Sequence, residues 1–380
     1  ARRALAGTYV EIVESLTLED GRSLEEAVNA VIASRPDLIF ITGGTDNGAA
    51  EAVMKLTETV ALACHLMPPN TKVKFLFAGN PALHEKVDAL LGGMGVVHSA
   101  PNVRPELGEE VLAPVRAALA EIFEQIRMAQ IGGFTDLAQS AGGHILPTAQ
   151  AEGQLLRFLA RASNSKKGVL GVDAGSAATT VAAVVRDELF LQVRPDLGLG
   201  VNVAALLNET PLEHLTRWLP SEVSENAVRE FILNKAAHPH TVPAEMNDLY
   251  LEHAVARQVI RAAVKQARAN WPAAARGPRA ELLSGFEHIV GIGAVFGRAP
   301  RPGSAALLLL DALQPVGLVS LRLDPHHLAA ALGAMAYTNP MAVTQLLETG
   351  SLLNLATAVS VVGRARAGDV VCQAKLVYEN

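Results

Sequence analysis

Three short apolar segments follow one another in the middle of the chain with no helix between them, and this run constrains the fold most strongly. Residues 168–172, 178–185 and 188–193 are rich in Val, Leu and Ala, and only Arg186 and Asp187 separate the last two. A connection of two residues joins antiparallel strands, because parallel strands need a crossover of a dozen residues or more. The run therefore predicts three consecutive strands, of which the last two form a hairpin.

The rest of the second half alternates helices with further strands. The expected segments are a helix at 245–269, a strand at 288–292, a helix at 304–313, a strand at 316–321 and a helix that starts at Asp324 and Pro325. In that start, the aspartate is the expected N-cap and the proline lies in the first turn. The predicted order is three strands, helices, and then two more strand–helix pairs.

The first half alternates strands and helices from its beginning. Strands are expected at 37–41, 72–77 and 95–98, and helices at 49–66, 81–91 and 109–128. This order favours a parallel sheet covered by helices. Residues 39–48 and 289–298 are both a strand followed by a glycine-rich loop, and each is followed by a helix, a strand and another helix, which indicates a duplicated architecture.

A polar break at 163–167 follows an expected helix at 150–162. We place the boundary between two α/β domains there, as residues 1–165 and 166–380. The chain begins at Ala1 with a sequence typical of the middle of a helix, so we expect it to be a piece of a longer protein.

The composition excludes several classes of partner. The net charge is −6 and no block of basic residues occurs, so binding to nucleic acid or to an anionic membrane is not expected. No apolar run reaches the ~18 residues that span a bilayer. Half of the residues are hydrophobic, enough for a large core. Cys64 and Cys372 are the only cysteines, which is typical of a reducing, cytoplasmic environment.

The strongest candidate site is the turn between the first two strands of the second half. Asp173 ends one strand, and Gly175 and Ser176 belong to a turn of small residues before Thr179. Small residues let backbone N–H groups approach a phosphate, the two hydroxyls can add donors, and Asp173 can hold Mg²⁺. The alternative interpretation is an ordinary hairpin with small residues.

A second candidate is the glycine-rich loop at 291–300. Gly291 and Gly293 at the end of a strand allow a planar base or ribose to lie against the backbone, and Arg298 can stack on a base or reach a phosphate. The glycine spacing differs from that of the dinucleotide-binding fingerprint. The alternative is a tight connection between a strand and a helix.

Two further loops carry candidate residues. Gly43, Gly44 and Asp46 lie in the segment 42–48, which is either a second ligand loop or an ordinary turn. Asp196 follows the third strand of the second half, where it can position a catalytic water or cap a helix. It is the one candidate catalytic residue.

These motifs resemble those of the superfamily of actin, sugar kinases and heat-shock chaperones. Residues 173–180 resemble its second phosphate loop, and residues 290–300 its adenosine loop. The resemblance implies two actin-like α/β domains around a cleft, with ATP and Mg²⁺ as ligands. The first domain of this chain then lacks its opening strands.

More specifically, the chain resembles the MutL-type accessory protein of glutamate mutase, which is unrelated to the mismatch-repair protein of the same name. The segment 36–48 is the most specific part of the resemblance, and it is joined by residues 78–80, 102–105, 196–198 and 368–371 together with the Asp173 loop. The resemblance implies an ATP-dependent reactivating chaperone whose partners are the subunits of an adenosylcobalamin-dependent mutase. Formation of a homodimer is left open.

Two departures from the family pattern concern the nucleotide site. The Asp-x-Gly-Ser-Thr phosphate loop with which the family begins is not found in this sequence, and Ser176 and Val181 replace a glycine and an acidic residue. The site is therefore incomplete in this chain, and at most a weak ATPase is expected. The alternatives are a small-molecule kinase of the same fold, with Asp196 or Asp46 as its acidic residue, and an interaction module that has lost nucleotide.

Overall fold

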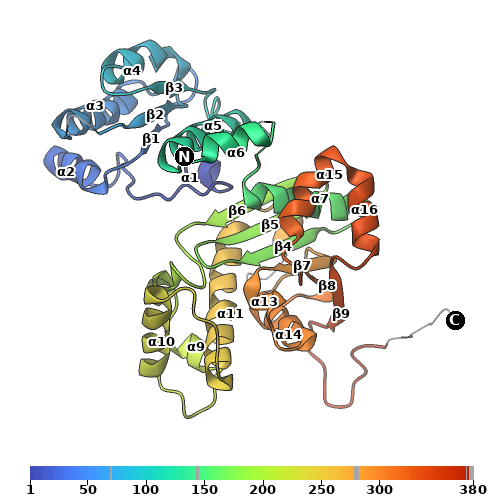
Figure 1. The fold of residues 1–380 in the computed structure, drawn as a ribbon. Coiled ribbons are helices and arrows are strands. Elements are labelled where there is room, and N and C mark those ends of the chain that lie inside the picture. Colours follow the sequence, from blue (N-terminus) through green and yellow to red (C-terminus); the bar gives the residue numbers. More distant parts are fainter. Residues whose placement is uncertain (69–70, 143–144, 278–281, 374, 376–380) are drawn as a thin grey trace. The chain divides into compact units, whose positions relative to one another are not determined.

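The computed structural model of the chain describes all residues except 69–70, 143–144, 278–281, 374 and 376–380. It divides into two compact units, Ala1–Ile145 and Leu146–Asn380, and each is considered by itself (Figure 1). The division lies earlier than the predicted boundary at 165/166. The reason is helix α7 (Thr148–Ala162), which packs on the sheet of the second unit through Leu155, Leu156 and Leu159.

The first unit is built on a parallel sheet, as predicted. In its described part the strands lie in the order β1 (Leu38–Ile41), β2 (Lys74–Phe77) and β3 (Val97–Ser99). The side chains of β2 alternate between two cores: Phe75 and Phe77 face one, and Leu76 faces the other. This alternation follows from the two-residue period of a strand.

Helices cover both faces of this sheet. Those on the Phe75 side are α2 (Leu24–Ser34), α3 (Glu51–Leu66) and α4 (His84–Leu91), which follows the short η1 (Pro81–Leu83). Those on the Leu76 side are α1 (Arg2–Leu5) and α5 (Ala113–Gln130), followed by α6 (Phe134–Ser140). Helix α2 begins with a capping box between Ser23 and Glu26.

The second unit contains a mixed sheet whose strand order among the described residues is β6-β5-β4-β7-β8-β9. The strands are β4 (Val169–Ala174), β5 (Thr179–Val185), β6 (Glu188–Arg194), β7 (His288–Ile292), β8 (Gly317–Leu323) and β9 (Leu353–Ser360). The first three strands are antiparallel neighbours, whereas β7 and β8 run parallel to β4. The three consecutive strands, the hairpin of the last two and the two later strands are as predicted, and β9 is an edge strand that was not predicted.

The two-residue connection between β5 and β6 is also confirmed. Arg186 and Asp187 both have positive φ, 51° and 67°. This pair of left-handed residues is typical of the type I′ turn, whose twist matches that of the flanking strands. The exposed ion pair between Asp187 and Arg161 of α7 lies beside this turn.

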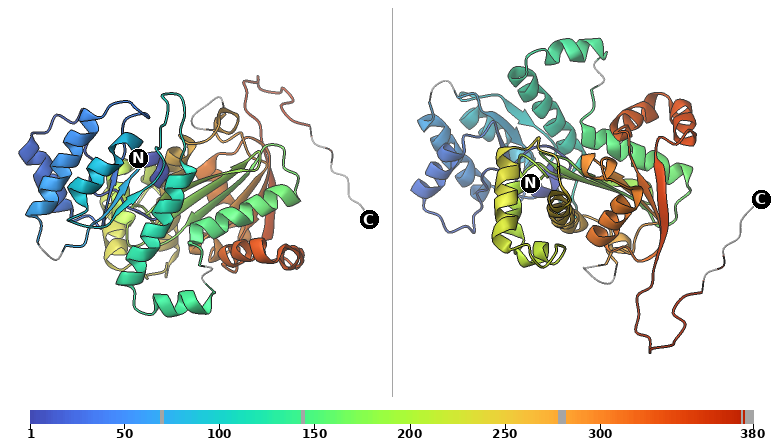
Figure 2. Two further views of the ribbon diagram at one scale, coloured as in Figure 1. Left: turned by 90° about the horizontal axis from the view of Figure 1, so that it is seen from above. Right: turned by 60° about the horizontal axis from the view of Figure 1, so that its bottom comes forward.

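Two helical layers enclose the sheet of the second unit (Figure 2). One layer contains α7, α15 (Ala329–Thr338) and α16 (Pro340–Glu348). The other is built around the long α11 (Met246–Arg268) and α14 (Pro302–Leu313). Further helices lie in the connections: η2 (Val203–Ala205), α8 (Leu206–Glu209), α9 (Glu213–Thr216), α10 (Glu225–Ala237), α12 (Ala273–Arg276) and α13 (Ala294–Gly297).

The start of α15 differs from the sequence prediction. Helical structure begins at Ala329 rather than at Pro325, and a turn containing His327 with φ 56° comes between. Asp324 still serves the helix, because its carboxylate accepts hydrogen bonds from the amides of Leu328 and Ala329 at 3.0 and 2.8 Å. The aspartate thus caps a helix that starts one turn later than predicted.

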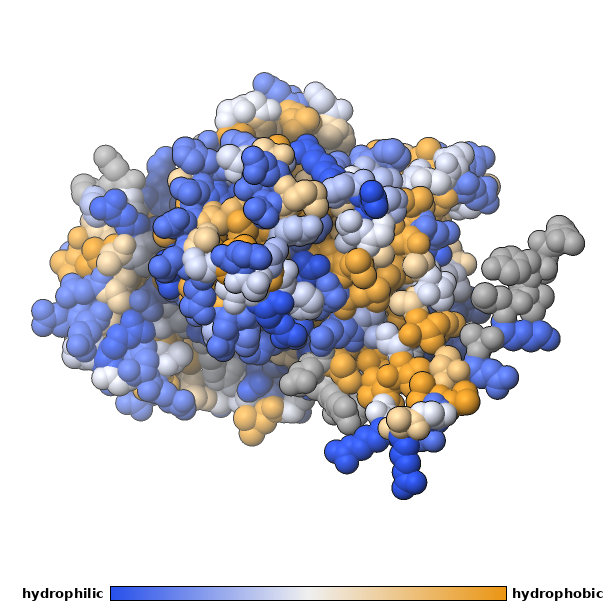
Figure 3. Space-filling model, turned by 90° about the horizontal axis from the view of Figure 1, so that it is seen from below, coloured by the Kyte–Doolittle hydropathy of each residue, from blue (hydrophilic) through white to orange (hydrophobic). Residues whose placement is uncertain are grey.

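Several large apolar side chains of the second unit remain exposed, among them Leu307 of α14, Leu318 of β8 and Val359 of β9. Leu318 and Val359 are direct partners across the antiparallel pair β8–β9. Hydrophobic residues also gather on one part of the face drawn in Figure 3. Single exposed apolar residues are ordinary on protein surfaces, and they carry no conclusion by themselves.

Candidate functional site

The site begins at the turn that joins β4 to β5. Asp173 and Thr180 are paired across the two strands, and the turn between them closes through a 3.1 Å hydrogen bond from the Gly175 amide to the Ala178 carbonyl. Ser176 and Ala177 are exposed at its tip. No hydrogen bond among the described residues uses the amides of Ser176, Ala177 or Ala178. The turn therefore presents consecutive unused N–H donors beside a carboxylate, which is the arrangement of an anion-binding nest.

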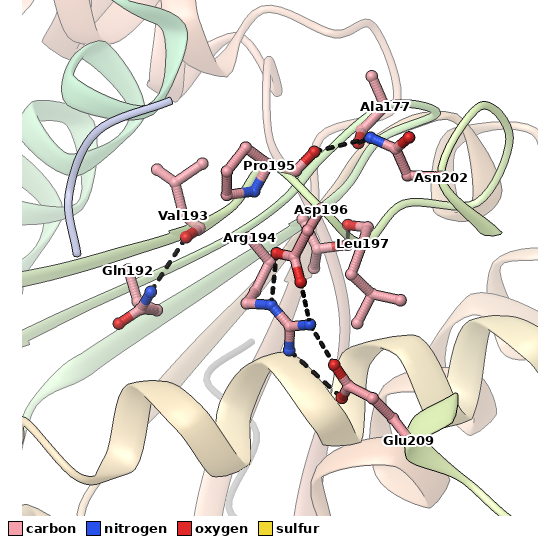
Figure 4. Close-up of polar contacts among 10 residues, drawn as sticks. Ala177, Gln192, Val193, Arg194, Pro195, Asp196, Leu197, Asn202 and Glu209 are labelled. Carbon is pink, nitrogen blue, oxygen red and sulfur yellow. Dashed lines mark hydrogen bonds and ion pairs between the residues drawn. The ribbon is translucent and has the colours of Figure 1, made fainter. Parts of the chain in front are cut away.

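The segment after β6 holds this turn in place. The amides of Leu199 and Gly200 donate to the carbonyls of Gly175 and Ser176, both at 2.8 Å. The side-chain amide of Asn202 donates to the carbonyls of Ala177 and Pro195 at 2.8 and 2.7 Å (Figure 4). These bonds occupy carbonyl oxygens and leave the N–H groups of the turn unused, so the donors are fixed in position before any ligand arrives.

The second glycine-rich loop meets the turn at the carboxyl end of β4. Asp173 is the register partner of Ile292 in β7, so the next residue, Gly293, lies beside the Asp173 carboxylate. A β-carbon on residue 293 would come within 2.7 Å of Asp173 Oδ1 and 2.8 Å of the Ala174 carbonyl oxygen. The structure thus brings together two motifs that are far apart in the sequence.

Two further carboxyl groups lie near Asp173. Asp324, which follows β8, is fully buried, and Glu152 of α7 is 3% exposed. No hydrogen bond is formed by the Glu152 side chain within the described part of the chain. Burial, with the charges of Asp173 and Asp324, raises the pKa of Glu152 to about 9. Burial and the Asp324 charge raise the pKa of Asp173 to about 6. Glu152 is therefore neutral at pH 7, while Asp173 is mostly ionised.

Sequence reasoning did not single out Glu152, and it treated Asp324 only as a helix cap. A signal for Glu152 does exist in the sequence. Ala149, Glu152, Leu156 and Leu159 follow at spacings of three and four residues on the buried face of α7. A carboxylic acid in such an apolar stripe is unusual, because burial of an unpaired charge is costly.

The other predicted residues of these two loops lie in different environments. The Thr179 hydroxyl donates to the Leu197 carbonyl at 2.9 Å and is fully buried, so it is not an available phosphate donor. Gly291 is buried and packs against Phe296 and Leu309 in the core rather than facing a ligand. Arg298 is exposed after α13. Of the hydroxyls predicted as donors, only that of Ser176 is exposed.

Asp196 is engaged in an ion pair. Arg194 donates to both of its carboxylate oxygens, at 2.8 and 2.6 Å, and also contacts Glu209 (Figure 4). The Arg194 guanidinium holds the pKa of Asp196 below its usual range. A carboxylate with a lowered pKa is a weaker general base. Asp196 is thus paired with Arg194, and its catalytic role stays a prediction.

The predicted loop of the first unit follows β1. Gly43 and Gly44 have φ of 153° and 70°, and Asp46 is exposed. Asn102, which follows β3, donates to the Gly44 carbonyl at 3.0 Å and to Asp46 Oδ1 at 2.8 Å. Asn80, which follows β2, accepts from the Asn47 amide at 3.3 Å. Asparagines at the carboxyl ends of two neighbouring strands thus fix the conformation of this loop.

The described residues contain no group of three or more His, Cys, Asp or Glu side chains arranged to hold a metal ion. Mg²⁺ bound with a nucleotide needs fewer protein ligands, because it takes one or two carboxylates, waters and phosphate oxygens. Asp173 beside the unused amides of the turn fits that mode. In the part of the chain that the structure describes, no helix is long and apolar enough to cross a membrane.

The strand order of the second unit and the direction of its strands define an α/β protein with a mixed sheet. A family model described as MutL protein matches residues 1–350. The chain therefore belongs to the MutL family, which confirms the family resemblance of its motifs.

The similarity to solved structures is weaker than the match to the family model. Component A of the (R)-2-hydroxyglutaryl-CoA dehydratase of Acidaminococcus fermentans is 12% identical, with 76% of this chain and 84% of that chain covered and a TM-score of 0.28. The archaeal actin homologue Ta0583 is 10% identical, with 77% of each chain covered and a TM-score of 0.27. A search among curated proteins finds no match.

Proposed function

We propose that the second unit binds a nucleotide at the Gly175–Ala178 turn and that the chain is a nucleotide-dependent accessory protein of an adenosylcobalamin-dependent mutase. The observation that carries the first part is the set of unused amides at Ser176, Ala177 and Ala178 beside the Asp173 carboxylate. Phosphate oxygens accept from these amides, and Mg²⁺ bridges the phosphates to Asp173. Gly293 leaves the backbone of the adjacent loop open for the nucleoside.

The protein's own groups have separate tasks in this proposal. The turn fixes the phosphates, Asp173 holds the cation, and Asn202 and Leu199 keep the turn rigid. Ligand binding also changes protonation, because a cation at Asp173 favours its ionised form over the protonated form that burial stabilises. Nucleotide affinity is therefore expected to fall as the pH drops below about 6, where Asp173 takes up a proton.

Titration calorimetry with ATP in the presence and absence of Mg²⁺ tests nucleotide binding. We expect binding that requires Mg²⁺, with a Kd between micromolar and millimolar, roughly −8 to −4 kcal/mol. Asp173→Asn removes the cation ligand at little change in volume and should abolish the Mg²⁺ requirement together with most of the affinity. Asp187→Asn, at an exposed turn position with φ 67° that asparagine tolerates, is the matched control.

Equal Mg²⁺–ATP affinities for the parent chain and the Asp173→Asn variant would exclude this site. A chain that binds no nucleotide, yet still binds mutase subunits, would instead be the interaction module that has lost nucleotide. The kinase alternative gains no support from Asp196, because Arg194 neutralises that carboxylate.

The partner is tested separately. Size-exclusion chromatography of the chain with the assembled, cobalamin-loaded mutase should show co-elution that depends on nucleotide. Assays with the isolated mutase subunits then identify which one is bound. Co-elution that is absent under every nucleotide condition would contradict the mutase assignment without affecting the nucleotide site.

A further inference from the structure

A cavity of about 300 Å³ lies in the second unit away from the Asp173 turn. It opens between the carboxyl-terminal half of α7, helix α16 and the β8–β9 pair. The residues that line it are Phe158, Leu159, Ala162, Ser163, Arg322, Thr344, Leu347, Glu348, Leu352 and Asn354. Ligand pockets begin at about this size, and they combine apolar walls with a few placed polar groups.

Arg322 is the unusual member of this lining. Its Nε atom is buried and has no hydrogen-bond partner. No hydrogen bond or ion pair joins its guanidinium to any residue that the structure describes. Buried polar groups in native proteins are nearly always satisfied, so a buried arginine nitrogen without a partner calls for an explanation.

Asn354 lies directly opposite Arg322 across the β8–β9 pair. An irregularity between Leu321 and Arg322 shifts the register, so that Asn354 rather than Leu355 faces Arg322. Such bulges re-aim side chains and are common beside functional sites. The Asn354 side chain is exposed, unlike the Nε atom of Arg322, and it forms no hydrogen bond with the described residues. Two unused donors therefore lie side by side on neighbouring strands.

The two hydroxyl groups of the cavity lining are already engaged. The Ser163 hydroxyl donates to the Leu159 carbonyl at 2.7 Å, and the Thr344 hydroxyl donates to the Pro340 carbonyl at 3.1 Å. Each hydroxyl has only one proton to donate. The side chains that can donate a hydrogen bond to a ligand in the cavity are therefore those of Arg322 and Asn354.

Among the residues that line the cavity, Arg322 is the one with a positive charge. His288 of β7 is the neighbouring titratable group, and burial, together with the Arg322 charge, lowers its pKa. Its imidazole is thus neutral at pH 7 and does not add a positive charge. Glu348 is exposed at the last position of α16, where the helix dipole is also negative. A doubly charged phosphate is disfavoured next to these groups.

We propose that this cavity binds a small monocarboxylate with a compact apolar body. Arg322 donates to the carboxylate in the bidentate geometry that a guanidinium allows, and Asn354 donates to one of the same oxygens. The apolar body lies against Phe158, Leu159 and Leu347. The site uses neither the Asp173 turn nor a nucleotide, so it is independent of the proposed function.

Calorimetric titration of the chain with hexanoate tests the proposal, with 1-hexanol and inorganic phosphate as comparison probes. We expect hexanoate to bind about tenfold or more tightly than 1-hexanol, which has a similar apolar body without the charge. Arg322→Met keeps a side chain of similar size and removes the hydrogen-bond donors. It should weaken hexanoate binding by a similar factor. Arg364→Met, at an exposed position outside the cavity, is the matched control and should bind hexanoate as the parent does.

A second variant tests the proposal in case Arg322→Met does not fold. Ala162 is exposed at the end of α7, so Ala162→Phe fills the cavity mouth without disturbing the core. It should abolish hexanoate binding while the circular dichroism spectrum is unchanged. The proposal is overturned if hexanoate does not bind, if 1-hexanol or phosphate binds as tightly, or if Ala162→Phe leaves hexanoate affinity unchanged.

Discussion

Gly293 lies against the carboxylate of Asp173, because β4 and β7 are parallel neighbours whose carboxyl ends meet at the same edge of the sheet. This contact joins the turn of the first hairpin to the loop before α13. It also explains why residue 293 has no side chain, since a β-carbon would overlap both the Asp173 carboxylate and the Ala174 carbonyl. The φ of 103° is a further reason, because side-chain-bearing residues rarely adopt it.

Gly293→Ala is therefore expected to destabilise the second unit. The added methyl group meets an oxygen 2.7 Å away and requires a strained backbone, which together should lower the free energy of unfolding by about 2–4 kcal/mol. Denaturant unfolding measures this change. Gly303→Ala in α14 is the control, because a β-carbon there meets nothing within 4 Å and alanine favours a helix by up to about 1 kcal/mol. Equal stability of the two variants would contradict the contact.

The buried Glu152 predicts a stability that falls as the pH rises. Its pKa is about 9 in the folded chain and 4.5 in the unfolded chain, so the folded state holds an extra proton between these values. The stabilisation is fully present below pH 4.5 and is lost as the pH approaches 9, with a slope of up to about 1.4 kcal/mol per pH unit.

Glu152→Gln removes that slope, because glutamine is neutral at every pH. We expect the rise in the free energy of unfolding to be larger at pH 8 than at pH 5 by up to about 4 kcal/mol, because the slope acts over three pH units. Urea unfolding at several pH values measures the effect. Glu230→Gln, at an exposed position of α10, is the matched control. A slope that survives in Glu152→Gln would show that the proton is bound elsewhere.

Sequence patterns predicted five of the six strands in the described part of the second unit's sheet, and they missed the edge strand β9. The hairpin at Arg186 and Asp187 depends on local turn chemistry, and the order of the later strands depends on apolar runs between helices. Both signals are contained in a few neighbouring residues. The start of α15 was predicted one turn too early, because the sequence cannot reveal that Asp324 reaches forward to Leu328 and Ala329.

The site was predicted less completely, for a related reason. Asp173 and Ser176 are recognisable from small residues at a strand end, but Thr179 and Asp196 have the same local pattern and are engaged by Leu197 and Arg194. Which of several polar residues stays unpaired is decided by tertiary contacts. Glu152 lies in a helix far from Asp173 in sequence, so only the packing of α7 against the sheet brings them together.

Asn102→Ala should loosen the predicted ligand loop of the first unit. Its amide donates to the Gly44 carbonyl and to Asp46, and its carbonyl oxygen accepts from the Arg104 amide at 3.0 Å. Asn102 is 6% exposed. Loss of these hydrogen bonds is therefore expected to lower the free energy of unfolding by about 2–4 kcal/mol.

Hydrogen exchange is the informative measurement for this variant. The Asp46 amide, which donates to the Pro105 carbonyl at 2.9 Å, should exchange faster when the loop is released. Asn29→Ala on the exposed face of α2 is the control and should leave that exchange unchanged. Unaltered protection of Asp46 in Asn102→Ala would mean that other contacts hold the loop.

The contact between α7 and α15 supports a last prediction. A β-carbon on Gly333 of α15 would lie 1.7 Å from the Ala151 carbonyl oxygen of α7, so the two backbones can be this close only with glycine. Ala151 precedes Glu152, and Asp324 caps α15. We therefore expect this contact to influence the distance between the two acidic groups. Gly333→Ala should force the helices apart and lower the free energy of unfolding by about 2–4 kcal/mol.

The pH dependence of this variant separates a local clash from a rearranged site. If α15 moves away and takes Asp324 with it, Glu152 loses part of the repulsion and burial that raise its pKa. The stability of Gly333→Ala should then fall less steeply between pH 6 and pH 9 than that of the parent chain. A variant that is destabilised by the same amount at every pH would show that the helices separate without moving the acidic groups, and that Glu152 is positioned by α7 and the sheet alone.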